Sequence, residues 1–168
     1  RDFYRCVYKG RELPVYILAD GRRKMDSFPA FWCPYNDTRL GWTALTGIAD
    51  YMFTATMDGC SFGIGHAAKD GTVIVGHVNS NHLQTPDSTR AMEKDQKLRL
   101  RALLSTGRHK PKVFEPQDYR YRKGVREVSA TTFGVREKGK WHFYAHRWVK
   151  DYSGMAVTFE YLGLTKIK

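Results

Sequence analysis

The chain has 168 residues and a formal net charge of +11, with 42% hydrophobic and 14% aromatic residues. This composition is typical of a globular protein rather than a disordered one, and the length predicts a single domain over residues 1–168. No apolar stretch approaches the length of a membrane span. The positive charge indicates a partner with an acidic surface, nucleic acid or anionic lipid headgroups. The chain begins at Arg1 and carries no secretory signal, so we expect it to be a fragment of a larger polypeptide.

Short β-prone segments dominate the N-terminal third of the chain. Residues 6–8 and 13–18 read as strands. Residues 28–35 are aromatic and interrupted by two prolines, so we expect an irregular, packed segment. Residues 43–52 predict a short helix, although they contain a glycine.

The clearest local signal is a β-hairpin. Residues 60–65 form an apolar run, residues 69–71 form a Lys-Asp-Gly turn, and residues 72–79 form the return strand. Asp-Gly between two such runs is a strong hairpin signal. Beyond it, residues 88–105 predict the best helix of the chain, because their apolar side chains recur at roughly helical spacing.

The C-terminal part of the chain predicts further strands. Residues 107–124 are polar, basic and contain proline, which indicates a long loop. A second hairpin follows, with strands at 127–135 and 141–149 around a turn at 136–140, and residues 155–162 form a last strand. We therefore expect a β-rich α/β fold, a β-sandwich of mixed sheets flanked by one or two helices and long loops.

Three cysteines, Cys6, Cys33 and Cys60, are present, and their spacing fits no zinc site, so we expect no structural metal. Cys6 and Cys33 could pair and leave Cys60 free, or all three could be thiols. We favour the interpretation that Cys6 and Cys33 are small buried hydrophobic residues.

The first hairpin brings Cys60 close to His77. An antiparallel return strand places the two residues opposite each other or one diagonal apart, where side chains can touch. A free thiol has a pKa of about 8.5, so at neutral pH it needs a base to become a nucleophile. An imidazole can take the thiol proton and later return it to a leaving group. The pair is therefore a candidate catalytic dyad.

Four neighbouring residues could complete this site. Asp58 and Gly59 read as a tight turn, whose backbone amides could receive an oxyanion. Thr54 lies on the segment that enters the site, and its hydroxyl or carbonyl could orient the ring of His77. Asn79 is the second candidate for that role, because it lies two residues after His77 and shares its face of the strand.

The same pattern has an ordinary structural interpretation. Free cysteine is one of the most buried residue types, so Cys60 could simply fill the core. The residues of the turn and of the strand end could have only local roles. His66 and His82 lie near the hairpin and are rivals of His77 for the role of base.

The segment around Cys60 resembles the core of a known enzyme family, the cysteine deamidases. The resemblance rests on the run Met57-Asp58-Gly59-Cys60, a strand, an Asp-Gly turn and a second strand that ends in His77. The catalytic domains of the cytotoxic necrotizing factors and related bacterial toxins have a Leu-Ser-Gly-Cys turn and a histidine one hairpin later. Here Asp58 replaces the serine, and an acid beside the nucleophile would raise the thiol pKa unless it points away.

The chemotaxis-receptor glutamine deamidases are similar as well. They have a threonine six residues before the cysteine and a histidine on the return strand, roles that Thr54, Cys60 and His77 match. The resemblance covers about residues 50–80 and implies a β-sandwich of mixed sheets wrapped by helices. It also implies hydrolysis of a glutamine side-chain amide through a thioester on the cysteine, without a metal or organic cofactor. An amine could intercept the same thioester, which would give transglutamination.

On this resemblance the partner is a protein substrate, an acidic-surfaced protein such as a small GTPase. We expect a monomeric toxin domain, the C-terminal fragment of a larger secreted bacterial effector that acts in the target-cell cytoplasm. The resemblance also implies that the backbone amides near Gly59 and Cys60 hold the oxyanion.

Two other function classes remain open. A cysteine peptidase or cell-wall amidase also uses a Cys-His pair, but papain-like enzymes place the cysteine at a helix N-terminus, whereas Cys60 opens a strand. The other class is a non-catalytic basic module that binds nucleic acid. No RNP motif, GxxG clamp or paired Cys/His finger supports it, and only residues 119–122 interleave basic and aromatic side chains. We therefore do not expect nucleic acid as the partner.

Overall fold

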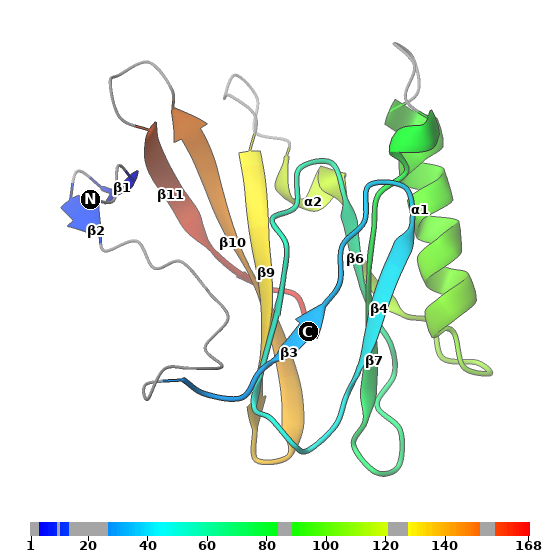
Figure 1. The fold of residues 1–168 in the computed structure, drawn as a ribbon. Coiled ribbons are helices and arrows are strands. Elements are labelled where there is room, and N and C mark those ends of the chain that lie inside the picture. The colour runs from blue at the N-terminus through cyan, green and yellow to red at the C-terminus, as the bar shows by residue number, and fades with distance from the viewer. Residues whose placement is uncertain (1–3, 10, 14–26, 84–88, 121–127, 152–156) are drawn as a thin grey trace.

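The computed structural model describes residues 4–9, 11–13, 27–83, 89–120, 128–151 and 157–168. The larger of its two sheets has seven strands in the order β2-β1-β11-β10-β9-β5-β3 (Figure 1). This sheet is mixed, because β1 runs parallel to β11 and β3 runs parallel to β5, while the other neighbours are antiparallel. Its strands are β1 (Tyr4–Tyr8), β2 (Arg11–Leu13), β3 (Phe31–Cys33), β5 (Tyr51–Thr54), β9 (Val128–Glu137), β10 (Lys140–Asp151) and β11 (Val157–Lys166).

The smaller sheet has four strands in the order β4-β7-β6-β8, and all its neighbours are antiparallel. Its strands are β4 (Leu40–Leu45), β6 (Ser61–Ile64), β7 (Val73–Val78) and β8 (Lys112–Phe114). The helical elements are a 3-10 turn η1 (Asn81–Leu83), the helix α1 (Thr89–Leu104) and the short helix α2 (Pro116–Tyr119). No helix among the described residues is long and apolar enough to cross a membrane.

The two sheets pack face to face around a hydrophobic core. Phe62 of β6 and Phe143 of β10 are buried between them, with their ring centroids 6.3 Å apart. Apolar side chains from both sheets share this core, among them Met52 and Ala130 from the larger sheet and Val75 from the smaller one. The β-rich sandwich that the sequence predicts is thus confirmed, with the refinement that only the seven-stranded sheet is mixed.

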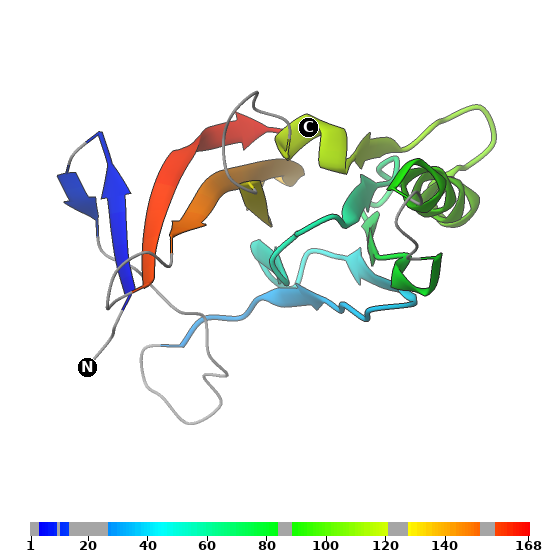
Figure 2. The same ribbon diagram turned by 90° about the horizontal axis from the view of Figure 1, so that it is seen from above.

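Helix α1 covers the outer face of the four-stranded sheet, so that sheet lies between the helix and the larger sheet (Figure 2). Leu100 and Leu104 are buried there. The helix comes so close to β6 that a Cβ atom at Gly63 would lie 2.6 Å from a methyl carbon of Leu104 and 2.8 Å from one of Leu100. Glycine at this strand position therefore lets the helix pack directly on the backbone.

Both predicted hairpins are present. Gly71, with φ +84°, completes the first turn, and β6 and β7 pair around it. The second turn is tighter than expected, because β9 and β10 extend to Glu137 and Lys140 and leave a two-residue loop. Both loop residues have positive φ, 49° at Lys138 and 79° at Gly139, as a type I′ turn requires. The helix predicted at residues 88–105 is confirmed as α1 over its described part.

Three segments differ from the prediction. The helix expected at residues 43–52 is wrong, because β4 and β5 occupy its two ends. The loop expected at residues 107–124 contains β8 and α2, and the irregular segment expected at residues 28–35 contains β3. Of the strand expected at residues 13–18, only residue 13 lies within the described part, and it belongs to β2.

Candidate active site

Cys60 and His77 lie on the same face of the four-stranded sheet. Phe62 pairs directly with His77 across β6 and β7. Cys60 precedes Phe62 by two residues, so it shares that face and lies one diagonal away from His77. The face is the one that meets the larger sheet, and both side chains are buried, with exposed fractions of 2% for Cys60 and 0% for His77.

Thr54 reaches His77 from the opposite sheet. Its hydroxyl lies 2.7 Å from Nδ1 of His77 and donates a hydrogen bond of 2.9 Å to the carbonyl oxygen of Cys33. A hydroxyl has one proton, and the carbonyl can only accept, so Thr54 must accept the hydrogen bond from Nδ1–H. The neutral ring therefore carries its proton on Nδ1 and its lone pair on Nε2. Among the described residues Nε2 is buried and has no hydrogen-bond partner, so it is the candidate base of the site.

Asn79 does not orient His77. Its side-chain amide donates to the hydroxyl of Tyr35 over 3.1 Å, and its amide oxygen accepts from the backbone N–H of Ser80 over 2.7 Å. Of the two residues proposed from the sequence to hold the imidazole, the structure supports Thr54. Asn79 instead holds an aromatic side chain against the site, because the ring of Tyr35 lies 4.9 Å from that of His77.

The turn before Cys60 is fixed by side chains of the two helices. Gly59 has φ +87°, a conformation that favours glycine, and its N–H donates to the hydroxyl of Tyr119 over 2.9 Å. The same hydroxyl donates to the carbonyl oxygen of Cys60 over 2.9 Å. The predicted oxyanion role of the Gly59 amide is therefore not supported, since that N–H already donates to Tyr119, and the amide of Cys60 remains the candidate for that role.

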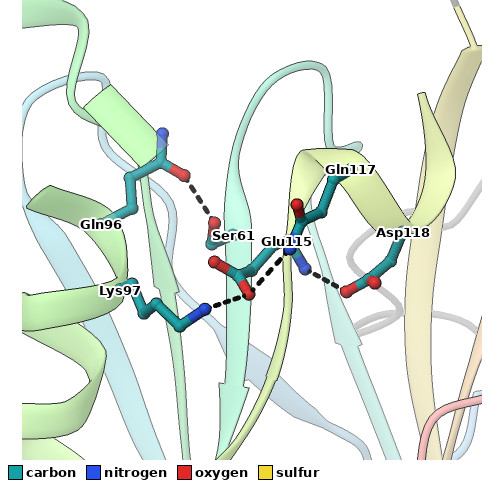
Figure 3. Close-up of polar contacts among 6 residues, drawn as sticks. All are labelled: Ser61, Gln96, Lys97, Glu115, Gln117 and Asp118. Carbon is teal, nitrogen blue, oxygen red and sulfur yellow. Dashed lines mark hydrogen bonds and ion pairs between the residues drawn. The ribbon is translucent and has the colours of Figure 1, made fainter. Parts of the chain in front are cut away.

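Gln96 of α1 holds the turn from the other side. Its amide nitrogen donates to the carbonyl oxygen of Gly59 over 2.9 Å, and its amide oxygen accepts from the hydroxyl of Ser61 over 2.6 Å. Figure 3 shows Gln96 and Ser61 pointing toward each other between α1 and β6. The next residue, Lys97, donates to the carboxylate of Glu115 over 2.7 Å and links α1 to the start of α2. The nucleophile turn is thus anchored to both helices.

Asp58, the residue that departs from the deamidase pattern, points toward Arg120. The carboxylate and the guanidinium lie 3.4 Å apart in an exposed ion pair. The carboxylate still acts on the neighbouring thiol, and its negative charge raises the pKa of Cys60. Arg120 limits that unfavourable effect because it supplies a compensating positive charge.

Both members of the candidate dyad are neutral at rest. Burial raises the pKa of the Cys60 thiol to about 11, and burial lowers the pKa of His77 to about 4. At neutral pH the pair is therefore a thiol and a neutral imidazole rather than a thiolate-imidazolium pair. Nucleophilic attack by this thiol would therefore require a base to take its proton during the attack.

Cys33 borders this arrangement, and the other described histidines lie outside it. Burial raises the pKa of the free Cys33 thiol to about 12, while hydrogen bonds with the Thr54 side chain and the His77 backbone lower it. The side chain of Cys6 is outside the described residues. His66 follows the other end of β6 and stacks on His109 at the surface, with ring centroids 4.0 Å apart, so it is not the base. The side chain of His82 is likewise outside the described part. The described residues contain no group of three or more side chains able to hold a metal ion.

Three site residues were missed from the sequence: Tyr35, Gln96 and Tyr119. Gln96 carried a usable signal, because it continues the buried stripe of Leu100 and Leu104 at four-residue spacing, and a polar residue on an apolar stripe needs a partner. Tyr35 and Tyr119 lie in segments expected to be irregular, where periodicity gives no guidance. The chain matches no protein-family model and no curated protein sequence, so its likeness to the cysteine deamidases rests on the residues named above alone.

Proposed function

We propose that the protein is a protein glutamine deamidase with Cys60 as nucleophile and His77 as base. The observation that carries the proposal is the hydrogen bond between Thr54 and Nδ1 of His77, 2.7 Å long, which leaves the Nε2 lone pair without a partner on the face that Cys60 shares. A threonine that fixes the tautomer of a buried histidine next to a cysteine is the arrangement that nucleophilic thiol catalysis needs.

The first half-reaction forms a thioester. Nε2 of His77 takes the proton of the Cys60 thiol while the sulfur attacks the side-chain carbonyl carbon of a glutamine. The carbonyl π electrons move to oxygen, and we assign the stabilisation of that oxyanion to the backbone amide of Cys60. The protonated His77 then gives its proton to the amide nitrogen, the C–N bond breaks, and ammonia leaves. Thr54 passes the charge-assisted hydrogen bond from Nδ1–H on to the carbonyl of Cys33.

The second half-reaction releases glutamate. Nε2 of His77 removes a proton from water, and the oxygen attacks the thioester carbon. The C–S bond breaks, the sulfur leaves as thiolate, and His77 returns the proton to it. An amine in place of water would give a transglutaminated product by the same steps. No hydrogen bond joins Cys60 to Nε2 among the described residues, and such bonds commonly tighten only when substrate is bound.

The net charge of +11 supports a substrate protein with an acidic surface, and a small GTPase is one such class. The proposal includes the setting that the resemblance implies, a monomeric domain of a secreted bacterial effector acting in a target-cell cytoplasm. Its chemistry uses side chains of this chain alone.

The test uses two cysteine variants and a cell extract. Wild type, Cys60→Ser and Cys6→Ala are incubated separately with extract proteins, and released ammonia is measured. Glutamine-containing peptides are then analysed by mass spectrometry for the increase of about one dalton that accompanies exchange of an amide for an acid. Cys6→Ala is the matched control because Cys6 lies on β1, at the opposite end of the seven-stranded sheet from β3 and β5.

We expect ammonia release and modified glutamines with wild type and Cys6→Ala, and neither with Cys60→Ser. Equal ammonia release by wild type and Cys60→Ser would refute the proposal. Newly cleaved peptides without ammonia, lost in Cys60→Ser, would assign the site to a peptidase instead.

A further inference from the structure

Tyr35 contacts three polar residues at the candidate site: His77, Asn79 and Asp37. Its ring lies against that of His77 at 4.9 Å with a tilt of 48°. Its hydroxyl accepts from the side chain of Asn79 over 3.1 Å and donates to the carboxylate of Asp37 over 2.6 Å. Since Cys60 and His77 are buried, Tyr35 is partly exposed and Asp37 is exposed, the tyrosine connects the buried pair to the surface.

The single proton of the Tyr35 hydroxyl is committed. A phenol has one O–H donor, and the short contact with Asp37 shows that the carboxylate, which can only accept, receives it. Toward Asn79 the phenol oxygen is an acceptor. In this arrangement the hydroxyl cannot donate to a second group, so the carboxylate of Asp37 and the sulfur of Cys60 compete for the one phenol proton.

We propose that Tyr35 is a positioning residue that controls the ionisation of Cys60, and that Asp37 restrains it by holding the phenol proton. As a role in catalysis this rests on the proposed deamidase function. A phenol released from Asp37 can turn its O–H toward the sulfur and stabilise the thiolate that forms during attack. Hydrogen bonding to a charged form favours that form.

The charges around Cys60 agree with this division of roles. Hydrogen bonding from Tyr35 lowers the pKa of the Cys60 thiol, whereas the negative charges of Asp58 and Asp37 raise it. The titratable groups that act on the thiol or are coupled to it are Tyr35, Asp37, Asp58 and Tyr119. Nearby, Arg120 pairs with Asp58, and the ring of His77 lies against Tyr35. Of these, Tyr35 and Asp37 can be altered without touching the proposed base or the turn of the nucleophile.

The experiment measures alkylation of Cys60 by iodoacetamide as a function of pH, with peptide mass spectrometry to separate Cys60 from the other cysteines. Tyr35→Phe keeps the ring against His77 and removes only the hydroxyl. Asp37→Asn keeps an acceptor for the phenol and removes the negative charge. Tyr51→Phe and Asp50→Asn are matched controls, because Tyr51 is exposed and Asp50 pairs with Arg136 away from the site.

We expect opposite effects from the two site variants. Tyr35→Phe raises the pH midpoint of Cys60 labelling and slows labelling at mildly alkaline pH by roughly two- to tenfold, the range that one hydrogen bond gives. Asp37→Asn lowers the midpoint, and its effect shrinks at high salt because Asp37 is exposed. The controls leave the midpoint unchanged.

A shift of both site variants in the same direction, or of neither, would overturn the proposal. A purely structural role of Tyr35 would speed labelling at all pH values without moving the midpoint. The labelling experiment does not depend on a protein substrate, so it separates a failure of this inference from a failure of the deamidase assignment. Where deamidation is observed, Tyr35→Phe is expected to lower kcat with little change in KM.

Discussion

The buried neutral His77 should make the free energy of unfolding decrease measurably at acid pH. Burial lowers the pKa of His77 from 6.5 to about 4, so the folded protein resists a proton that the unfolded chain accepts. The stability that comes from keeping His77 neutral is complete above the unfolded pKa and is lost as the pH falls from there toward the folded pKa. The replacement His77→Asn removes the titration while keeping a side-chain N–H that can donate to Thr54.

The size of the effect follows from the two pKa values. A shift of this size corresponds to about 3 kcal/mol in full, at about 1.4 kcal/mol for each pKa unit. Relative to roughly pH 7, His77 should reduce the free energy of unfolding by about 1 kcal/mol at roughly pH 5.5 and by about 2 kcal/mol at roughly pH 4.5. His77→Asn loses some packing at every pH, but that cost does not depend on pH.

Urea unfolding of wild type and His77→Asn at these three pH values measures the prediction. The wild type should lose about 2 kcal/mol more than the variant between the first and the last pH. His142→Gln serves as control, because His142 lies on the outer face of β10, opposite to the buried face of Phe143. This variant should show the same change in the free energy of unfolding with pH as the wild type. Parallel stability curves for wild type and His77→Asn would show that the imidazole is not held neutral, and the tautomer argument would fail with it.

Three further substitutions test the supports of the site. Thr54→Val removes the hydroxyl between His77 and the carbonyl of Cys33; it should lower deamidation by at least about tenfold and Thr54→Ser should restore it, whereas equal loss in both would point to packing. Tyr119→Phe removes the hydroxyl that pairs with the N–H of Gly59 and the carbonyl of Cys60, so thermal unfolding should show a loss of stability of about 1–3 kcal/mol. An unchanged melting temperature would contradict this role of Tyr119. Gly63→Ala forces a methyl group against α1 and should lower the free energy of unfolding in urea by about 1–3 kcal/mol. An unchanged free energy would contradict the close packing of α1 on β6.

The fold could be predicted where local chemistry sets the geometry. The Asp-Gly and Lys-Gly turns define both hairpins, and alternation places Trp141 and Phe143 inward on β10. The helix expected at residues 43–52 failed because pairing of Leu40–Leu45 with β7 overrides local preference. The three residues of β8 and the four of α2 are too short to show any periodicity.

The candidate site likewise has one part that local sequence predicts and another that depends on tertiary packing. Strand parity alone places Cys60 and His77 on one face, because the turn between them fixes the register. The contact between Thr54 and His77 crosses from one sheet to the other, and no local sequence pattern shows how two sheets are aligned. Thr54 is predicted because the chemotaxis-receptor deamidases have a threonine six residues before the cysteine. Tyr35 could not be found, since its role depends on a loop whose path only tertiary packing determines.

The hydrogen bond from His77 to Thr54 joins strands of different sheets, and this has a consequence for how the protein can fail. A slide of one layer against the other by a fraction of a side chain would break that bond while leaving both backbone ladders intact. The imidazole could then move its proton to the other nitrogen, and the reacting thiol would lose its acceptor. Under the proposed mechanism, catalytic activity therefore depends more sensitively on the alignment of the two sheets than the content of secondary structure does. Mild heating, or a smaller side chain at Phe62 or Phe143, should silence the site before the sandwich melts.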